Sequence, residues 1–175
     1  KTTLLRLIAG LELPDAGVIA LDDEVVSAVD WATPPHSRGI GIVFQRSALW
    51  PHMTVAQNLC FAMNGLSKAE ADAHLHEILE RVVLTNLRDR YPSQLSGGEA
   101  RRVAVGRAMA ARPKRLLLDE PLTSLDPELK GRLLTAILEY AHETGATVLY
   151  ITHDREEARA VGHVRLCMER GRIVG

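Results

Sequence analysis

Several residue types are scarce in this sequence, and each scarcity argues against a class of protein. Only 4% of the 175 residues are aromatic, which argues against an all-β sandwich and against a surface for stacking nucleic-acid bases. The 21 basic and 22 acidic residues give a formal charge of −1, so no overall attraction to nucleic acid or membrane is expected. The hydrophobic fraction of 46% and the length together favour one α/β domain with an aliphatic core.

Cysteines and long apolar runs are also scarce. Cys60 and Cys167 are far apart and have no partner at metal-ligand spacing, so we expect two unpaired, buried thiols in a reducing compartment. No run approaches the roughly 18 apolar residues of a membrane-spanning helix, and Lys1 does not begin a secretory signal. We therefore expect a cytosolic chain. Because it begins without methionine and ends in a strand-like run, 171–175, we expect it to be a piece of a longer protein.

Hydrophobic periodicity and capping residues predict alternating helices and strands. The predicted helices are 1–11, 54–63, 67–83, 96–112, 127–143 and a short one after Asp154. The predicted strands are 17–21, 24–26, 40–44, 115–118 and 147–151, the first two forming a short antiparallel hairpin. Near-continuous apolar strands between helices indicate a mostly parallel sheet, whose ligands bind beyond the carboxyl ends of the strands.

Polar side chains follow two of these strands. Asp119 and Glu120 come after strand 115–118; one carboxylate can hold Mg²⁺ through water, and the other can orient or deprotonate an attacking water. His153 follows strand 147–151 and is expected at the same edge. Taken alone, the two acids fit a solvated turn equally well, and the histidine fits a structural role.

Two segments carry features of phosphate binding. Ser96, Gly97 and Gly98 stand at a predicted helix start, where free N–H groups and the helix dipole favour an anion, although an ordinary capped helix has the same pattern. The run 1–3, Lys-Thr-Thr, resembles the end of a phosphate-binding loop, whose lysine contacts phosphates and whose hydroxyl binds Mg²⁺. The glycines of such a loop are absent here, so this run by itself has little specificity for phosphate.

Five motifs in order resemble those of ABC transporter ATPase subunits. They are Gln45 with Trp50–Val55, Leu95–Ala104, Leu117–Pro121, Ser124–Asp126 and Ile151–Asp154. The resemblance covers essentially the whole chain and departs from the family pattern at Glu99, often Gln, and Gly106, often Ala. It implies a single P-loop NTPase-type domain: a mostly parallel sheet flanked by helices (core 1–48 and 106–175), an inserted α-helical subdomain at about 49–105, and a short antiparallel β piece near the N-terminus.

The resemblance also implies ATP and Mg²⁺ as cofactors. Because the family's Gly-rich loop is absent before Lys1, we expect these 175 residues alone to bind ATP poorly and to have little activity. The resemblance assigns the following roles in one subunit. Lys1 would contact the β and γ phosphates, Thr2 would ligate Mg²⁺, and Thr3 would lie near the α-phosphate. Asp119 would support the metal, and Glu120 would be the general base for the attacking water.

The remaining roles concern the γ-phosphate and partner subunits. His153 would touch the γ-phosphate, and Gln45 would link the metal or water to a transmembrane partner. The signature segment, Ser96–Gly98, would close over ATP on a second ATPase subunit in a head-to-tail dimer. Asp126 would help communication between the two sites.

The function implied by the resemblance is transport-coupled ATP hydrolysis. The subunit would sit at the cytoplasmic face of the plasma membrane, bound to permease subunits and linked indirectly to a solute-binding protein. Residues 50–55 resemble the loop of importer subunits and favour bacterial uptake of small ions, such as molybdate, sulfate, iron or polyamine, over lipid export.

The alternative is a non-transport ABC-type ATPase acting on nucleic acid or ribosomes. The stretch 88–115 holds eight basic and two acidic residues, but it is spread around a helix with only Tyr91 as an aromatic, so we expect a solvated face and no nucleic-acid partner. DNA-repair relatives carry long insertions between the glutamine loop and the signature segment, whereas here Gln45 and Ser96 are 51 positions apart. A non-hydrolysing regulatory module is disfavoured because Glu120 and His153 are both present.

Overall fold

A three-stranded parallel sheet forms the centre of the computed structural model, which describes residues 1–174. Its strands lie in the order β3 (Ile40–Val43), β4 (Arg115–Asp119) and β5 (Thr147–Ile151). In the pairing register, Val43 lies opposite Leu118, and Asp119 lies opposite Ile151. All three strands therefore end at the same edge, as the alternating pattern predicts.

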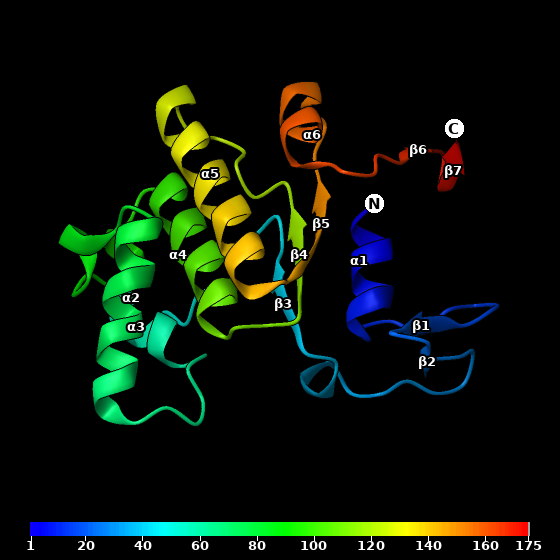
Figure 1. The fold of residues 1–175 in the computed structure, drawn as a ribbon, viewed down its shortest axis with the longest axis horizontal. Coiled ribbons are helices and arrows are strands. Elements are labelled where there is room, and N and C mark those ends of the chain that lie inside the picture. Colours follow the sequence, from blue (N-terminus) through cyan, green and yellow to red (C-terminus); the bar gives the residue numbers. More distant parts are fainter. Residues whose placement is uncertain (175) are drawn as a thin grey trace.

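Helices cover both faces of this sheet. Figure 1 shows α4 and α5 on one side of the sheet and α1 on the other. The helices are α1 (Thr2–Ala9), α2 (Val55–Cys60), α3 (Lys68–Arg81), α4 (Gly97–Ala110), α5 (Pro127–Thr144) and α6 (Arg155–Val161). Short 3₁₀ turns, η1 to η3, occupy Pro35–Ser37, Thr85–Leu87 and Pro92–Gln94. The predicted mostly parallel α/β fold is confirmed.

The predicted helix starts are confirmed, and five of the six, those of α2 to α6, have a side-chain cap. Thr54, Ser67 and Ser96 each cap their helix through the side-chain oxygen, and the residue three positions later bonds back to the cap's N–H. Asp126 and Asp154 cap α5 and α6. Four helices end two or three residues earlier than predicted: α1 at Ala9, α2 at Cys60, α3 at Arg81 and α4 at Ala110.

Two antiparallel hairpins lie outside the central sheet. The first pairs β1 (Ile19–Leu21) with β2 (Glu24–Ser27), as predicted. The second pairs β6 (Cys167–Glu169) with β7 (Arg172–Val174); β6 was not predicted, and Gly175 lies outside the described residues. Cys167 is exposed and Cys60 is only partly buried, so the prediction of two buried thiols is wrong. The reason is that β6 and β7 pair only with each other and leave most of their side chains at the surface.

The side chains of β4 divide between two hydrophobic cores. Leu116 and Leu118 belong to the larger core, which they share with α2 to α5. Leu117 belongs to the smaller core under α1. The predicted boundary between helical subdomain and core at 105/106 falls inside α4, and the division stays a prediction. Among the described residues, no helix combines the length and apolarity needed to cross a bilayer.

The arginine-rich stretch is only partly a solvated face, since Arg88, Arg90, Arg112 and Lys114 are exposed. Arg102 is only 8% exposed and donates to the carbonyls of Val82 and Val83, at the end of α3. The last carbonyl groups of a helix have no hydrogen-bond donor within the helix, and the Arg102 guanidinium donates to them instead. Burial lowers the pKa of Arg102. Arg107 donates to the Ala48 carbonyl at 3.0 Å. The prediction is therefore wrong for these two arginines, which satisfy internal carbonyl groups.

Candidate functional site

β4 brings two carboxylates to the carboxyl edge of the sheet and turns them toward different partners. Side chains alternate along a strand, so Asp119 points to the same face as Leu117, the face covered by α1. Asp119 is only 3% exposed. Glu120 follows in the left-handed region, with φ of 49°, and its N–H donates to the Ile151 carbonyl at 2.9 Å. This uncommon conformation turns Glu120 away from the direction of Asp119.

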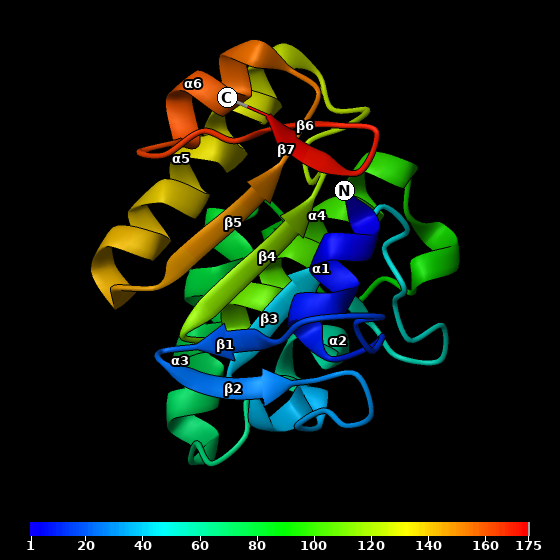
Figure 2. The same cartoon turned by 90° about the vertical axis from the view of Figure 1, so that its right-hand side faces the viewer.

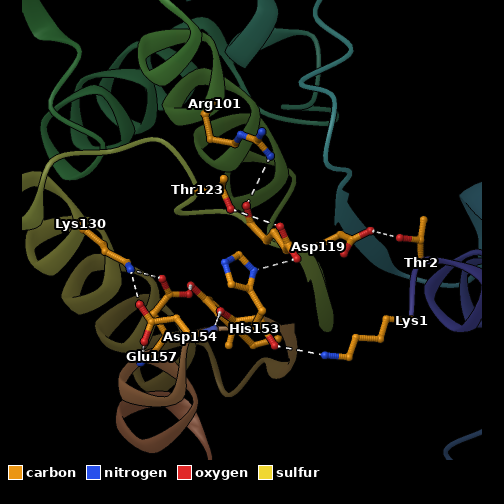
Figure 3. A network of polar contacts seen from close by, with 12 residues as sticks. Lys1, Thr2, Arg101, Asp119, Thr123, Lys130, His153, Asp154 and Glu157 are labelled. Atoms are coloured by element: carbon orange, nitrogen blue, oxygen red, sulfur yellow. Dashed lines mark hydrogen bonds and ion pairs between the residues drawn. The ribbon is translucent and has the colours of Figure 1, made fainter. Parts of the chain in front are cut away.

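Asp119 meets the start of α1. The Thr2 hydroxyl donates to Asp119 Oδ2 at 2.6 Å, as Figure 3 shows. A hydroxyl and a carboxylate are oxygen ligands of the kind that Mg²⁺ prefers, so this pair fits the ion. Within residues 1–174 no group of three or more His, Cys, Asp or Glu could hold a metal. A cation here would therefore complete its shell with water and phosphate oxygens, which is the usual arrangement for Mg²⁺.

The start of α1 lies near the ends of β4 and β5 (Figure 2). Lys1 is the N-cap residue, and no side chain caps the helix. The Lys1 ammonium nitrogen lies 3.4 Å from the carbonyl oxygen of Thr152. Thr3 is exposed in the first turn. Uncapped first-turn N–H groups, an ammonium and a hydroxyl together make this helix start favourable for phosphate.

Glu120 meets His153 on the other side of the edge. His153 Nδ1 lies 3.0 Å from Glu120 Oε1, and the histidine side chain is 72% exposed. Two residues that the sequence analysis did not identify also contact Glu120 (Figure 3). Thr123 donates its hydroxyl to Oε2 at 3.4 Å, and Arg101 Nη1 donates to the main-chain carbonyl at 3.4 Å. Thr123 could have been identified from the sequence, because it stands three residues after Glu120. Arg101 comes from α4, so no local signal points to it.

The turn that carries His153 is fixed on both sides. The N–H of Asp154 donates to the Thr152 hydroxyl at 2.9 Å, across the histidine. The Asp154 carboxylate accepts from Glu156 N–H and pairs with Lys130. The hydrogen bond from Lys130, together with these backbone N–H groups, lowers the pKa of Asp154 to about 2. The carboxylate is therefore ionised at neutral pH.

The signature segment forms a separate exposed start of α4. The Ser96 hydroxyl accepts from Glu99 N–H at 3.2 Å, and Ser96 N–H donates to the Glu99 carboxylate at 2.7 Å. This bond to Ser96 is the main cause that lowers the pKa of Glu99. Gly97 faces open space, whereas a Cβ on Gly98 would lie 3.0 Å from Leu125. The segment is thus accessible to a ligand from outside the chain.

The predicted site residues fall into two groups. The first group lies at the sheet edge and comprises the start of α1, Lys1 to Thr3, with Asp119, Glu120 and His153; hydrogen bonds join Thr2 to Asp119 and Glu120 to His153. Within residues 1–174, no hydrogen bond joins Ser96–Gly98, Gln45 or Asp126 to that group. Gln45 is exposed two residues after β3. Asp126 is exposed at the start of α5, where it accepts from Leu129 N–H at 2.9 Å, and it lines a groove with Glu99.

Comparison with known proteins agrees with this architecture. The sequence profile described as ABC transporter matches residues 1–123. Among solved structures, the dimeric post-hydrolysis state of the ATP-binding cassette MJ0796 bound to ADP and Pi is 30% identical. Its TM-score is 0.80, and the match covers 91% of this chain and 72% of that one.

Relatives of known sequence extend the match over nearly all of the chain. The spermidine/putrescine import ATP-binding protein PotA of Chromobacterium violaceum is 45% identical over 175 residues, 99% of this chain and 47% of that protein. The sulfate/thiosulfate import ATP-binding protein CysA of Thermosynechococcus vestitus is 45% identical over 177 residues, which cover 99% of this chain and 51% of that protein. The chain spans about half the length of these relatives. The chain belongs to the ABC transporter family and is similar to its ATP-binding subunits.

Proposed function

We propose that this chain binds and hydrolyses ATP and couples hydrolysis to solute import through a separate permease. The observation that carries the proposal is the pair of contacts at one sheet edge, Thr2 with Asp119 and Glu120 with His153. Phosphoryl transfer needs mainly positioning and charge stabilisation, and these groups supply both.

Phosphate binding falls to the start of α1. Lys1 pairs with the β and γ phosphates, Thr3 lies near the α-phosphate, and the uncapped N–H groups of α1 favour the negative charge. Thr2 and Asp119 hold Mg²⁺, with Gln45 reaching the metal or the water. The ion, when bound, neutralises charge that develops on the phosphate oxygens.

Water activation falls to Glu120. Its carboxylate orients the attacking water and accepts a proton from it, and His153 and Thr123 hold the two carboxylate oxygens in place. His153 is exposed, so its Nε2 is free to face the γ-phosphate of a bound nucleotide. The bond to Glu120 uses Nδ1 only.

The second group of residues acts between subunits. Ser96 and Gly97 are exposed and Gly98 is half-buried, and this segment closes over ATP held by a second copy or homologue, which gives a head-to-tail dimer. Asp126 links the two sites. The permease binds on the cytoplasmic face of the membrane, and a solute-binding protein acts through it. The relatives named for spermidine/putrescine, sulfate/thiosulfate and Fe(3+) import support a small-ion importer.

The alternative function on nucleic acid or ribosomes has less support than import. Its main argument was the basic stretch 88–115, and the guanidinium groups of Arg102 and Arg107 donate to internal carbonyls. Such contacts leave these two arginines less able to meet a phosphate backbone.

The test is a pair of matched variants of the protein expressed from its complete open reading frame. Glu120→Gln keeps the size of the side chain but cannot accept the water proton, so turnover is expected to fall by about 10²-fold or more. Dimers formed with ATP and Mg²⁺ are expected to persist in size-exclusion chromatography. Glu139→Gln, on the exposed face of α5, is the control and should match the unmodified protein. Undiminished turnover of Glu120→Gln would remove Glu120 from the base role.

A further inference from the structure

Lys130 joins two segments that the proposed function uses separately. It lies in the first turn of α5, and its N–H donates to the Asp126 carbonyl at 2.9 Å. Its ammonium nitrogen lies 2.6 Å from Asp154 Oδ2 and 2.5 Å from Glu157 Oε1, both on the α6 segment (Figure 3). One residue therefore connects the start of α5, where Asp126 stands, with the turn that carries His153.

The contact with Glu157 is the buried part of this connection. The Glu157 side chain is only 7% exposed, and its other oxygen accepts the Tyr150 hydroxyl from β5 at 2.9 Å. A buried carboxylate requires a paired charge and hydrogen bonds to stay ionised. Lys130 supplies the charge, so α6 is held against α5 and β5 together. Without Lys130, Glu157 would keep only a neutral donor.

His153 depends on this anchoring because its own ring has little support. The ring is 72% exposed and bonds to Glu120 alone among the described residues. Its position is therefore set by the backbone of the turn. The N–H of Asp154 closes that turn onto the Thr152 hydroxyl, and the Asp154 carboxylate is held by Lys130. A shift of Asp154 would carry the imidazole away from Glu120.

We propose that Lys130 is a positioning residue for ATP hydrolysis: it holds the turn that carries His153 against α5. The inference rests on the proposed function and adds a residue that acts through His153 without touching the substrate. A displacement of about 1 Å in a catalytic group can reduce the rate by up to about 10²-fold, so the loss of this anchor is measurable.

The experiment compares Lys130→Met and Lys130→Arg with the control Lys68→Met, all in the protein from the complete open reading frame. Lys68 is exposed in the first turn of α3. For Lys130→Met we expect kcat to fall by about tenfold with KM for ATP within twofold, because the phosphate-binding residues are untouched. Lys130→Arg should restore most of the rate, since it keeps the charge. Lys68→Met should be unchanged.

The decisive readout is the same substitution in a His153→Ala background, followed by single-turnover hydrolysis so that slow rates are resolved. If Lys130 acts through His153, Lys130→Met causes no further loss there. The proposal is overturned if Lys130→Met lowers the rate tenfold both in the unmodified protein and in the His153→Ala variant. It is also overturned if Lys130→Met causes no loss in the unmodified protein.

A second variant covers the case in which Lys130→Met does not fold. The double variant Lys130→Met/Glu157→Gln removes the unpaired buried charge but still lacks the anchor, so its kcat is expected to stay low. A rate equal to the unmodified protein in a folded double variant overturns the inference. Failure of the proposed function is distinct, because then His153→Ala and Glu120→Gln would themselves leave turnover intact.

Discussion

Adding one methyl group at two buried glycines is expected to have opposite effects on stability. In β3, a Cβ on Gly41 would lie 2.7 Å from the Ala108 carbonyl oxygen of α4 and 2.8 Å from the Pro113 ring. In α4, a Cβ on Gly106 would lie 3.1 to 3.3 Å from the ends of Leu59, Ile78 and Val82. The backbone carbonyl and the proline ring at Gly41 cannot yield, whereas the side-chain methyl groups at Gly106 need to move by only a few tenths of an ångström.

The magnitudes follow from these neighbours. Gly41→Ala should cost about 3 kcal/mol, the upper end of the usual range for overpacking, because both neighbours are rigid and closer than 3.0 Å; it should recover about 0.5–1 kcal/mol of chain entropy, for a net destabilisation of about 2 kcal/mol. Gly106→Ala should gain about 1 kcal/mol in helix propensity and about 0.8 kcal/mol from methyl burial. Overpacking removes about 1 kcal/mol of that gain, because the side chains shift by a few tenths of an ångström. The net is a stabilisation of up to about 1 kcal/mol.

Urea unfolding, monitored by circular dichroism, measures both free energies of unfolding. Thermal unfolding monitored in the same way gives Tm. For a chain of this size, Gly41→Ala should lower Tm by about 4–8 °C, and Gly106→Ala should raise it by about 1–3 °C. The close approach at Gly41 also sets how near α4, which begins after Ser96, lies to the sheet that carries Asp119. Equal and small effects of both variants would refute the distinction between rigid and flexible neighbours on which the reasoning depends.

Three other substitutions test the packing and electrostatics of the chain. Arg38 is 4% exposed and donates to carbonyls from three segments, so Arg38→Met should lower the unfolding free energy by about 3–5 kcal/mol in urea titrations; a loss below about 1 kcal/mol would contradict this. The folded-state pKa of Asp154 is about 2, below its usual 3.8, so its stabilisation is present above about pH 4 and is lost between about pH 4 and 2. Unfolding midpoints from pH 5 to 2 should therefore fall less steeply in Asp154→Asn, and identical slopes would show that this carboxylate does not contribute. Glu99→Gln removes a negative charge beside Ser96 while keeping an oxygen that accepts the Ser96 N–H, so the KM for ATP should fall several-fold; an unchanged KM would argue against phosphate binding at this helix start.

Local features of the sequence predicted the elements and their starts. Residues 116–118 are three leucines in a row, and strand β4 follows because a buried strand suits such a short apolar run. Ser67 and Asp126 cap helices through hydrogen bonds to residues three positions away, so the information lies within one turn. By contrast, β6 has no apolar alternation, and its pairing with β7 was visible only in the structure.

Long-range partners explain most of what the sequence did not predict. Arg102 is buried because the carbonyls of Val82 and Val83, 20 and 19 positions earlier, end a helix beside it. Lys130 pairs with Asp154, which is 24 positions away in the sequence, and the residues next to either one give no local signal of this contact. Charged residues are usually exposed, so composition and periodicity assign such residues to the surface by default.

The contact between Thr2 and Asp119 has a different status, because the strand period could have predicted it. Successive side chains of β4 alternate between the two faces, and Leu117 packs under α1 while Leu118 packs against the other helices. Asp119 is two positions after Leu117 and therefore shares the α1 face, where Thr2 begins the helix. A slip of one residue in this strand would send the carboxylate to the opposite face and separate it from Thr2. The register that Leu116, Leu117 and Leu118 fix by burial is thus also what brings Asp119 to Thr2, so core packing and site geometry are specified by the same alternation.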